Sequence, residues 1–409
     1  MTFFGASRSP RNIVFGPGQR RSVAGYASGL GQSALIVTDS RMAADPETGL
    51  LAASLTAAGV KVAVFSDTIA ELPLDSLQAG CEAGRRHGAD LVIGLGGGSC
   101  IDAAKIIALI LTHGGHPRSY YGELNVPGPI MPVIALPTTA GTGSEVTPVA
   151  VIADPEKEMK VGIASPHLIP HTAICDPELT YSCPAGLTAI SGADALTHAI
   201  EAFTARRRSP TETLVHEHVF LGKNAISDAY ALLAIGHLTA GLKRAYDNPS
   251  DTEARQRVML GSLAAGLAFG TAGTATAHAI QYPVGTLTHT PHGLGVATLM
   301  PYVMDFNRLY CESELALIAV AMGISSTGRT QAQMACNAIN GVDTLFASIG
   351  IPATIADLGV RAVDLPMIVE RAMGSARLIK NSPRELTLPL MADIVGAAFH
   401  GQKSPDLTN

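Results

Sequence analysis

The sequence predicts an α/β domain built on a doubly wound parallel sheet, followed by an all-helical domain. In the first part, short runs of β-branched residues alternate with amphipathic stretches, which is typical of parallel strands joined by crossover helices. From about Pro184 onward, long stretches with a 3.6-residue period dominate and strand signals almost vanish. We therefore expect an α/β domain over residues 1–183 and a helical domain over residues 184–409.

Four buried strands are expected in the first domain, separated by helical segments. A small hairpin follows them, formed by 149–153 and 161–164. The four strands are 34–38, 61–65, 90–94 and 133–136.

Four long helices are expected in the second domain, where apolar residues recur at helical spacing. The segment 209–224 has no clear period, so we predict a loop there. The four helices are 185–204, 225–246, 251–269 and 330–349.

Composition narrows the class of protein. Of the 409 residues 47% are hydrophobic and 15% are charged, which excludes disorder as the main state. A net charge of −6 argues against nucleic acid or an anionic membrane as the main partner. No apolar run reaches the roughly 18 residues that span a bilayer. The first 21 residues lack the apolar core of an export signal, and the six cysteines form no CxxC pair, so we expect a cytoplasmic protein with reduced thiols.

A glycine cluster, Gly96-Gly97-Gly98-Ser99, follows the third predicted strand and opens a helix. Such a turn lets a phosphate approach the backbone, where free N–H groups and the helix dipole hold it. The segment around this cluster matches neither the dinucleotide fingerprint GxGxxG nor the P-loop motif. The alternative is a tight turn that serves packing alone.

A second turn, rich in hydroxyls and glycine, runs from Leu136 to Glu145 after the fourth strand. In a doubly wound sheet both turns lie at the carboxyl ends of strands, where such folds bind ligands. Asp39 follows the first strand and is suited to accept a hydrogen bond from a ribose hydroxyl. A helix N-cap is an equally good interpretation of Asp39 taken alone.

A carboxylate and an imidazole share one face of a predicted helix, because Asp194 and His198 are four residues apart. His278 lies in another helical stretch, and His292 lies at a turn or helix start. One carboxylate with three imidazoles suits Fe(II) or Zn(II). Each histidine taken alone is more often a core or surface group. Glu201 shares the face of Asp194 and is either an orienting group behind a ligand or an ordinary helix carboxylate.

Taken in series, these motifs resemble the iron-containing (group III) alcohol dehydrogenases along nearly the whole chain. The resemblance rests on Gly96-Gly97-Gly98-Ser99-x2-Asp102-x2-Lys105, on Leu136-Pro-Thr138-Thr139-x-Gly141-Thr142-Gly143-Ser144-Glu145, on Asp194-Ala-Leu-Thr-His198-Ala-Ile-Glu201, on His278-x13-His292-Gly293 and on Asn381-Ser-Pro-Arg384. It implies a dehydroquinate-synthase-like fold, a homodimer, and hydride transfer between NAD(H) and an alcohol, aldehyde or hydroxy acid.

The resemblance also implies site residues. The metal ligands, for Fe²⁺ with Zn²⁺ as the second choice, are Asp194, His198, His278 and His292. The NAD contacts are Asp39, Gly97, Gly98, Ser99, Asp102, Thr138, Thr139, Thr142 and, as a weaker candidate, Lys160.

The chain departs from the family pattern four residues after His278, where many members have a proton-relaying histidine. Tyr282 stands there, so the candidates for proton transfer are Tyr282, His289 and a chain of water molecules. This departure, and the apparent insertion 209–223, also resemble the hydroxyacid-oxoacid transhydrogenase branch. We keep that branch, a dehydroquinate-synthase-type lyase and a non-catalytic nucleotide-binding protein as alternatives. The run Arg206-Arg207-Arg208 is interpreted as a charged helix end rather than a substrate contact.

Overall fold

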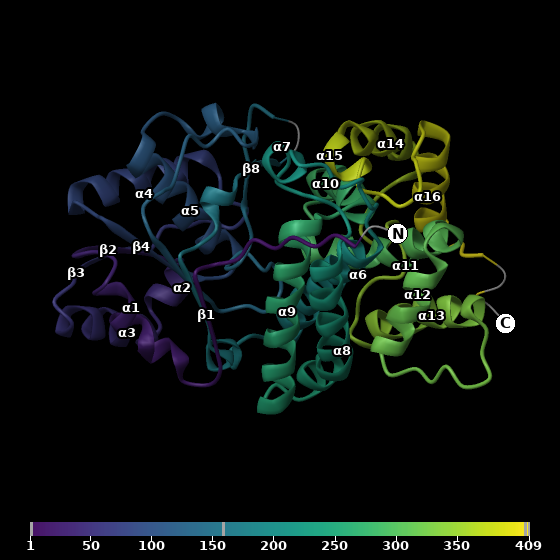
Figure 1. Cartoon of the computed structure of the whole chain (residues 1–409), viewed down its shortest axis with the longest axis horizontal. Coiled ribbons are helices and arrows are strands. Elements are labelled where there is room, and N and C mark those ends of the chain that lie inside the picture. The colour runs from purple at the N-terminus through teal and green to yellow at the C-terminus, as the bar shows by residue number, and fades with distance from the viewer. Residues whose placement is uncertain (1–2, 158–159, 405–406, 408–409) are drawn as a thin grey trace. The chain divides into compact units, whose positions relative to one another are not determined.

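The computed structural model describes residues 3–157, 160–404 and 407, which form two compact units. The α/β unit comprises 8–182 and 213–219 and is purple to blue in Figure 1, with a short teal piece. The helical unit comprises the segment that ends at Ser7, then 183–212 and the chain from Phe220 onward. Each unit thus takes one short piece of chain from beyond the boundary expected at residue 183.

A six-stranded, all-parallel sheet forms the centre of the α/β unit. Every residue of the three strands β2, β4 and β6 is buried, as expected for strands covered on both faces. In spatial order the strands are β1 (Asn12–Phe15), β9 (Thr172–Cys175), β6 (Val133–Pro137), β4 (Leu91–Gly96), β2 (Ser33–Val37) and β3 (Lys61–Phe65).

Helices cover both faces of this sheet (Figure 1). On one face α1 (Val23–Ala27) and α3 (Pro46–Ala57) pack against one set of strand side chains, including Ile36. On the other face α4 (Leu74–His87) and α5 (Gly98–His113) pack against the alternate set, including Leu35. The doubly wound arrangement predicted from the alternating pattern is therefore confirmed.

A three-stranded sheet is added to the α/β unit. The predicted hairpin is confirmed as β7 (Val149–Ile152) paired antiparallel with β8 (Val161–Ala164), and β5 (Gly122–Glu123) pairs with β8. The short remaining elements of the unit are η1 (Gln19–Ser22), α2 (Ser40–Ala43), η2 (Pro117–Tyr120), η3 (Pro166–Leu168), η4 (Pro177–Thr180) and α7 (Leu214–Glu217). Helix α7 lies within the segment 209–224, for which we predicted a loop.

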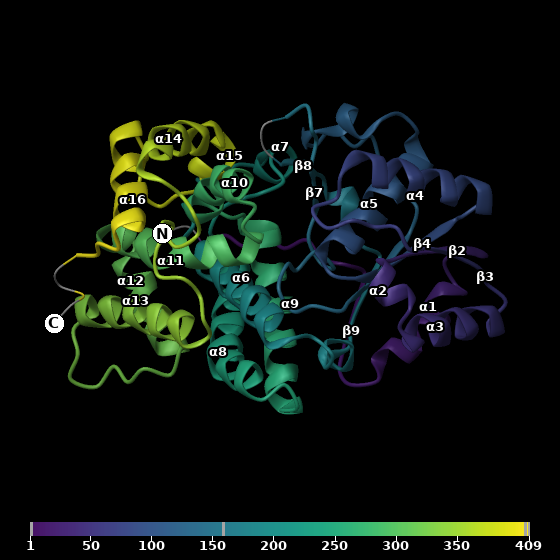
Figure 2. The same cartoon turned by 180° about the vertical axis from the view of Figure 1, so that it is seen from behind.

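The helical unit contains the four predicted long helices within three residues of their expected ends. In it α6, α8 and α9 lie side by side (Figure 2). Its elements are α6 (Ala185–Thr204), α8 (Ala225–Asp247), α9 (Thr252–Ala272), α10 (Thr276–Thr288), α11 (His292–Asn307), η5 (Arg308–Tyr310), α12 (Glu312–Ala321), α13 (Gln331–Ser348), η6 (Ala362–Asp364), α14 (Leu365–Gly374), α15 (Ala376–Ile379) and α16 (Leu388–His400).

Helix α8 bears on the expectation that no segment spans a membrane. With 23 residues and a mean hydropathy of 1.3 it is long and apolar enough to cross a membrane by length and composition, and α9 with α10 would pass the same test as one span bent by 102°. In this fold α8 buries a stripe at helical spacing, including Ala231, Ile235, Leu238 and Leu242, against α6 and α9.

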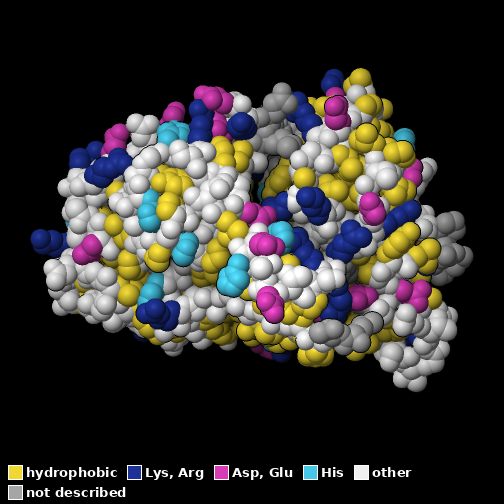
Figure 3. All heavy atoms as spheres, turned by 45° about the horizontal axis from the view of Figure 1, so that its top comes forward, with side chains coloured by type: hydrophobic (Ala, Val, Ile, Leu, Met, Phe, Trp, Pro, Cys, Tyr) yellow, Lys and Arg dark blue, Asp and Glu magenta, His cyan; other side chains and the backbone are white. Residues whose placement is uncertain are grey.

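Acidic, basic and hydrophobic side chains are intermixed on the face drawn in Figure 3.

Candidate functional site

Helix α6 presents three functional side chains on one face, at i, i+4 and i+7. The Oδ1 atom of Asp194 lies 3.7 Å from Nε2 of His198. Glu201 follows one turn later, and its side chain is 1% exposed. The predicted pairing of a carboxylate and an imidazole from one helix is therefore present.

Glu201 ties a second helix to the first. It accepts hydrogen bonds of 2.7 Å from the backbone N–H groups of Ala275 and Ala277 and from Nδ1 of His278. The first two bonds satisfy donors at the start of α10, and the third fixes the His278 ring. The Nε2 atom of His278 consequently points inward and lies 3.9 Å from Asp194 Oδ1.

His292 is the first residue of α11, and the glycine after it lets this helix approach α6. A Cβ on Gly293 would lie 2.6 Å from the carbonyl oxygen of Ile190 and 2.9 Å from Cβ of Asp194. No other residue fits such an approach without moving the helices apart. His292 Nε2 thereby comes within 3.9 Å of Asp194 Oδ1.

The four predicted ligand residues thus meet, with one ligand atom from each lying within 4.8 Å of all the others. In a tetrahedral site with bonds of about 2.1 Å, ligand atoms are about 3.4 Å apart, so a small inward movement closes the set on one cation. Nε2 of His278 is buried and has no hydrogen-bond partner among the residues that the structure describes. A carboxylate and three imidazoles fit a divalent iron or zinc ion.

One side of this cluster is open. The side chains of Asp194, His198 and His278 are 4–6% exposed, whereas that of His292 is 31% exposed. The opposite side is closed by Phe269, whose ring stacks on His198 at 4.2 Å between centroids. A substrate oxygen therefore reaches the cluster from the side of His292.

The two side-chain candidates for proton transfer lie in different surroundings. The ring of Tyr282, one turn after His278 on α10, stacks 6.2 Å from that of His292. Burial raises the pKa of Tyr282, and the nearby Arg377 guanidinium opposes this rise. His289 is exposed beyond the end of α10, with φ 56°. Within the described chain, no hydrogen bond or ring contact joins His289 to the four ligands.

Asn381 was noted in the sequence without a role, and the structure places it behind the cluster. Its Nδ2 atom donates to the carbonyl oxygens of Ala272 (3.0 Å) and Thr274 (3.2 Å), just before α10. The backbone carbonyl oxygen of Asn381 accepts a 2.9 Å hydrogen bond from the backbone N–H group of Arg206, just after α6. Asn381 therefore links the end of one ligand-bearing helix to the start of the other.

In the α/β unit, the glycine cluster forms the turn from β4 into α5. Gly96 has φ +152°, and a Cβ there would lie 2.5 Å from Sγ of Cys100, so the turn requires glycine. Gly97 is the N-cap of α5 and no side chain caps this helix. The first amides of α5, from Gly98 and Ser99, therefore remain at a helix N-terminus suited to an anion.

The second turn lies directly beside the first, because β6 and β4 are neighbours in the sheet. The N–H group of Thr138 donates to the carbonyl oxygen of Gly96 at 2.9 Å. A Cβ on Gly98 would lie 2.6 Å from Cγ2 of Thr142, and one on Gly97 would lie 3.5 Å from Oγ1 of Thr139. The two turns together form one polar edge.

Asp39 joins this edge from the neighbouring strand β2. Its Oδ1 atom accepts a 2.8 Å hydrogen bond from the N–H group of Met42, so it is the N-cap of α2. Its Oδ2 atom lies 3.8 Å from Sγ of Cys100, next to the first glycine turn. The capping role and a place beside a bound ribose are therefore compatible.

Two other predicted nucleotide contacts have protein partners. Asp102 accepts hydrogen bonds from the hydroxyl of Ser144 and from the N–H group of Val151 at 2.9 Å, so it braces the second turn against α5. Lys160 forms a 2.8 Å ion pair with Glu71.

Two further ionisable groups near the turns, Lys105 and Glu145, are buried. Lys105 is fully buried and donates to the carbonyl oxygens of Thr147 (2.9 Å) and Val149 (2.8 Å). Burial lowers the pKa of Lys105 to about 8 and raises that of Glu145 to about 7. The lysine therefore holds the chain after the second turn and is not available to a phosphate.

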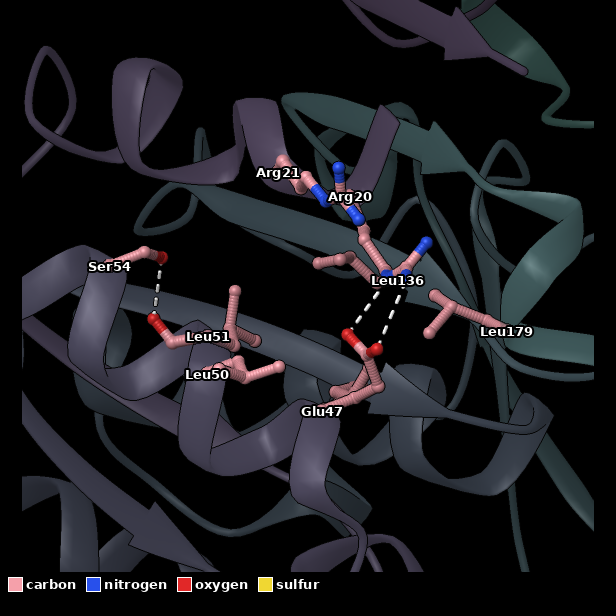
Figure 4. A pocket seen from close by; sticks show the side chains of 9 residues that line it. Arg20, Arg21, Glu47, Leu50, Leu51, Ser54, Leu136 and Leu179 are labelled. Carbon is pink, nitrogen blue, oxygen red and sulfur yellow. Dashed lines mark hydrogen bonds and ion pairs between the residues drawn. The ribbon is translucent and has the colours of Figure 1, made fainter. Parts of the chain in front are cut away.

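A pocket of about 240 Å³ opens on the α1 and α3 face of the sheet (Figure 4). Its leucines include Leu95, which directly precedes the first turn, and Leu136, with which the second turn begins. At its rim the guanidinium of Arg20 is neutralised by Glu47, Asp176 and Glu178. The pocket therefore suits an uncharged group better than a phosphate.

Comparisons with known proteins cover nearly all of the chain. Residues 10–177 match the family described as "Iron-containing alcohol dehydrogenase", and residues 188–399 match "Fe-containing alcohol dehydrogenase family, C-terminal". The chain is 34% identical to long-chain-alcohol dehydrogenase 1 of Geobacillus thermodenitrificans, over 90% of this chain and 89% of that protein. It is 32% identical to NAD-dependent methanol dehydrogenase of Bacillus methanolicus, over 95% and 98%. A crystal structure of 1,3-propanediol oxidoreductase superposes with a TM-score of 0.90 at 33% identity, over 98% of this chain and 100% of that chain.

Proposed function

The chain belongs to the iron-containing alcohol dehydrogenase family and is an oxidoreductase acting on alcohols and aldehydes, and on this premise we propose which of its residues hold the metal ion and the cofactor. The metal residues are Asp194, His198, His278 and His292. The observation that supports them is the meeting of their four ligand atoms within 4.8 Å. The ion is Fe²⁺, with Zn²⁺ as the second choice. The chemistry that such an ion supplies when bound is Lewis-acid polarisation of the substrate oxygen.

The cofactor of the proposal is NAD(H), held at the polar edge of the α/β unit. The N–H groups that open α5 receive the pyrophosphate, and Asp39 accepts a ribose hydroxyl and disfavours a 2′-phosphate. Thr138, Thr139 and Thr142 add hydroxyls beside it, and the leucine-lined pocket offers an apolar surface to an uncharged part of the dinucleotide. Asp102 acts by bracing the second turn, and Lys160 is the weakest member of the set because Glu71 already pairs with it.

The residues of the helical unit orient the reactants. Glu201 fixes the ring of His278, and Phe269 closes the site behind His198, so the substrate oxygen has one way in, beside His292. Tyr282 lies on that open side, and its hydroxyl oxygen is the atom that we propose to give up or take a proton. His289, exposed beyond the end of α10, is the second candidate.

The remaining parts of the proposal rest on the family resemblance. They are a homodimer and a cytoplasmic location, with which the six free cysteines agree. The relatives named above are dehydrogenases and an oxidoreductase of alcohols, so neither the transhydrogenase nor the lyase alternative is favoured.

Replacement of one ligand tests the proposal. In H278A we expect metal content and NAD-linked alcohol oxidation to be lost, while the affinity for NADH largely survives. His400, an exposed histidine of the same unit, provides the matched control, and H400A should retain both metal and turnover. Metal analysis of anaerobically purified protein and NADH absorbance measure the two effects. Undiminished turnover in H278A would contradict the proposed site.

A further inference from the structure

The open side of the metal cluster carries a positive charge that the mechanism above does not use. Tyr282 stacks on His292, the most exposed of the four ligands. The Arg377 guanidinium lies near enough to the tyrosine hydroxyl to oppose the rise of its pKa. A single tyrosine therefore separates this guanidinium from the side on which substrate enters.

Packing holds Arg377 in place. It belongs to α15, which packs against α10, and its guanidinium lies 4.6 Å above the ring of Phe220. The aromatic face restricts the plane of the fork, which is otherwise costly to immobilise.

The charge environment of Arg377 differs from that of other arginines in the chain. Within the part of the chain that the structure describes, no carboxylate lies within 4.0 Å of it. Arg20 and Arg207, in contrast, each have a carboxylate partner, and Arg207 pairs with Asp228 at 3.3 Å. A half-buried, fixed guanidinium without a counterion favours an anion from outside, because it donates two parallel hydrogen bonds to a carboxylate.

We propose that Arg377, positioned by Tyr282, is an anion subsite that takes the acidic tail of a short hydroxy acid or of the matching aldehyde acid. The inference rests on the proposed function, since it concerns the tail of the substrate whose alcohol or aldehyde oxygen the proposed metal site receives. It differs from the sequence interpretation, which considered a carboxylate contact only at Arg206-Arg207-Arg208. There Arg206 and Arg207 are exposed and Arg207 is engaged by Asp228.

The test compares acids and alcohols of equal carbon number on the metal-loaded enzyme with NAD. Glycolate, 3-hydroxypropanoate and 4-hydroxybutanoate are set against ethanol, 1-propanol and 1-butanol. We expect at least one acid to exceed its matched alcohol in kcat/KM by about tenfold or more, the range of a charge-assisted contact. 2-Hydroxyethanesulfonate shares the spacer of 3-hydroxypropanoate and tells a tetrahedral sulfonate from a planar carboxylate; preference for either one supports an anion subsite.

Variants assign the preference to the residue. R377M should remove most of the acid-over-alcohol ratio, chiefly through a higher KM for the acid, and R377K should restore part of it. Y282F should lower the ratio less than R377M does. Lys380, an exposed cation in the same turn of chain, is the matched control, and K380M should keep the native ratio. Titration calorimetry of 3-hydroxypropanoate without NAD gives a readout besides turnover, and R377M should weaken this binding by about tenfold.

The outcomes separate this inference from the function beneath it. If the native enzyme oxidises the alcohols but prefers no acid, or if R377M leaves the ratio and the calorimetric affinity unchanged, the subsite is wrong and the function stands. If neither alcohols nor acids are oxidised with NAD by enzyme of full metal content, the proposed function fails and the subsite with it. Metal content and circular dichroism of R377M confirm that the comparison is made on folded protein.

Discussion

Glu201 illustrates how one buried carboxylate can serve both a helix and a ligand. All of its three bonds come from donors: two backbone N–H groups that open α10, and the ring N–H group of His278. Because a carboxylate is an acceptor at both oxygens, it satisfies them together. By accepting the hydrogen bond of the Nδ1–H group, the carboxylate also fixes the tautomer of His278 and raises the basicity of the atom that faces the metal site.

Replacing Glu201 by Gln should therefore weaken metal binding without removing a ligand. The glutamine side chain offers only one acceptor oxygen, and its NH₂ group would face one of the three N–H groups that now donate to Glu201. We expect metal affinity to fall about 10- to 100-fold in E201Q. Competition with a chromophoric chelator measures it. Glu253, an exposed carboxylate on α9 that pairs with Arg244 and Arg257, gives the control variant E253Q, whose metal affinity should match the native value. Equal affinities in the two variants would rule out the orienting role.

What the sequence reveals at the residue scale depends on how far apart the partners are in the chain. Asp194 and His198 were predicted as a pair because four residues make one helical turn. Arg377 was not singled out, because its partner Tyr282 lies 95 positions earlier and no local pattern relates them. Asn381 had a recognisable motif but no visible role, since its partners Ala272 and Thr274 are more than 100 positions away.

At the scale of elements, periodicity predicted the long helices and the buried central strands but not the strands β1 and β9. These two strands of four residues each form a strand pair with each other across 160 positions. Their place in the sheet is a product of long-range pairing. The close approach of the two glycine turns was likewise expected only in outline, from the rule that parallel strands end at one edge.

The turn of β4 into α5 gives a prediction at this scale. A methyl group at Gly98 would lie 2.6 Å from Cγ2 of Thr142 and would push the second turn away from the first. We expect G98A to raise the KM for NAD by about tenfold, equivalent to one charge-assisted hydrogen bond, while metal content stays native.

Gly49 supplies the matched control in the same unit. It lies inside α3, where a Cβ would meet nothing within 4 Å, so G49A should keep the KM for NAD and raise the stability of the helix by up to about 1 kcal/mol. Steady-state kinetics with varied NAD and denaturant unfolding measure the two effects. A native KM in G98A would mean that the nucleotide does not bind at this turn.

On the scale of the whole molecule, each unit contains one of the two proposed sets of binding residues. All four metal residues, with Glu201 and Asn381 behind them, belong to the helical unit. Asp39 and both glycine turns belong to the α/β unit. The pattern of the sequence changes near residue 183, where we expected a boundary, but no feature of the sequence revealed that 213–219 joins the α/β unit.

Removing the metal should therefore affect the two units differently. The proposed ion would link α6, α10 and α11. A ligand that binds only the folded state stabilises it by about 4 kcal/mol when present at 1,000 times its dissociation constant, so we expect the ion to stabilise the helical unit by about this amount. After chelation we expect turnover to disappear and the unfolding temperature in calorimetry to fall by several degrees, because the stabilisation is lost.

NADH should still bind, as measured by its fluorescence, since no nucleotide residue lies in the helical unit. Restoring Fe²⁺ or Zn²⁺ anaerobically should recover the unfolding temperature, and the ion that also restores turnover is the one the enzyme uses. Loss of NADH binding on chelation, or an unfolding temperature that does not respond to metal, would show that the two sets of residues do not act separately.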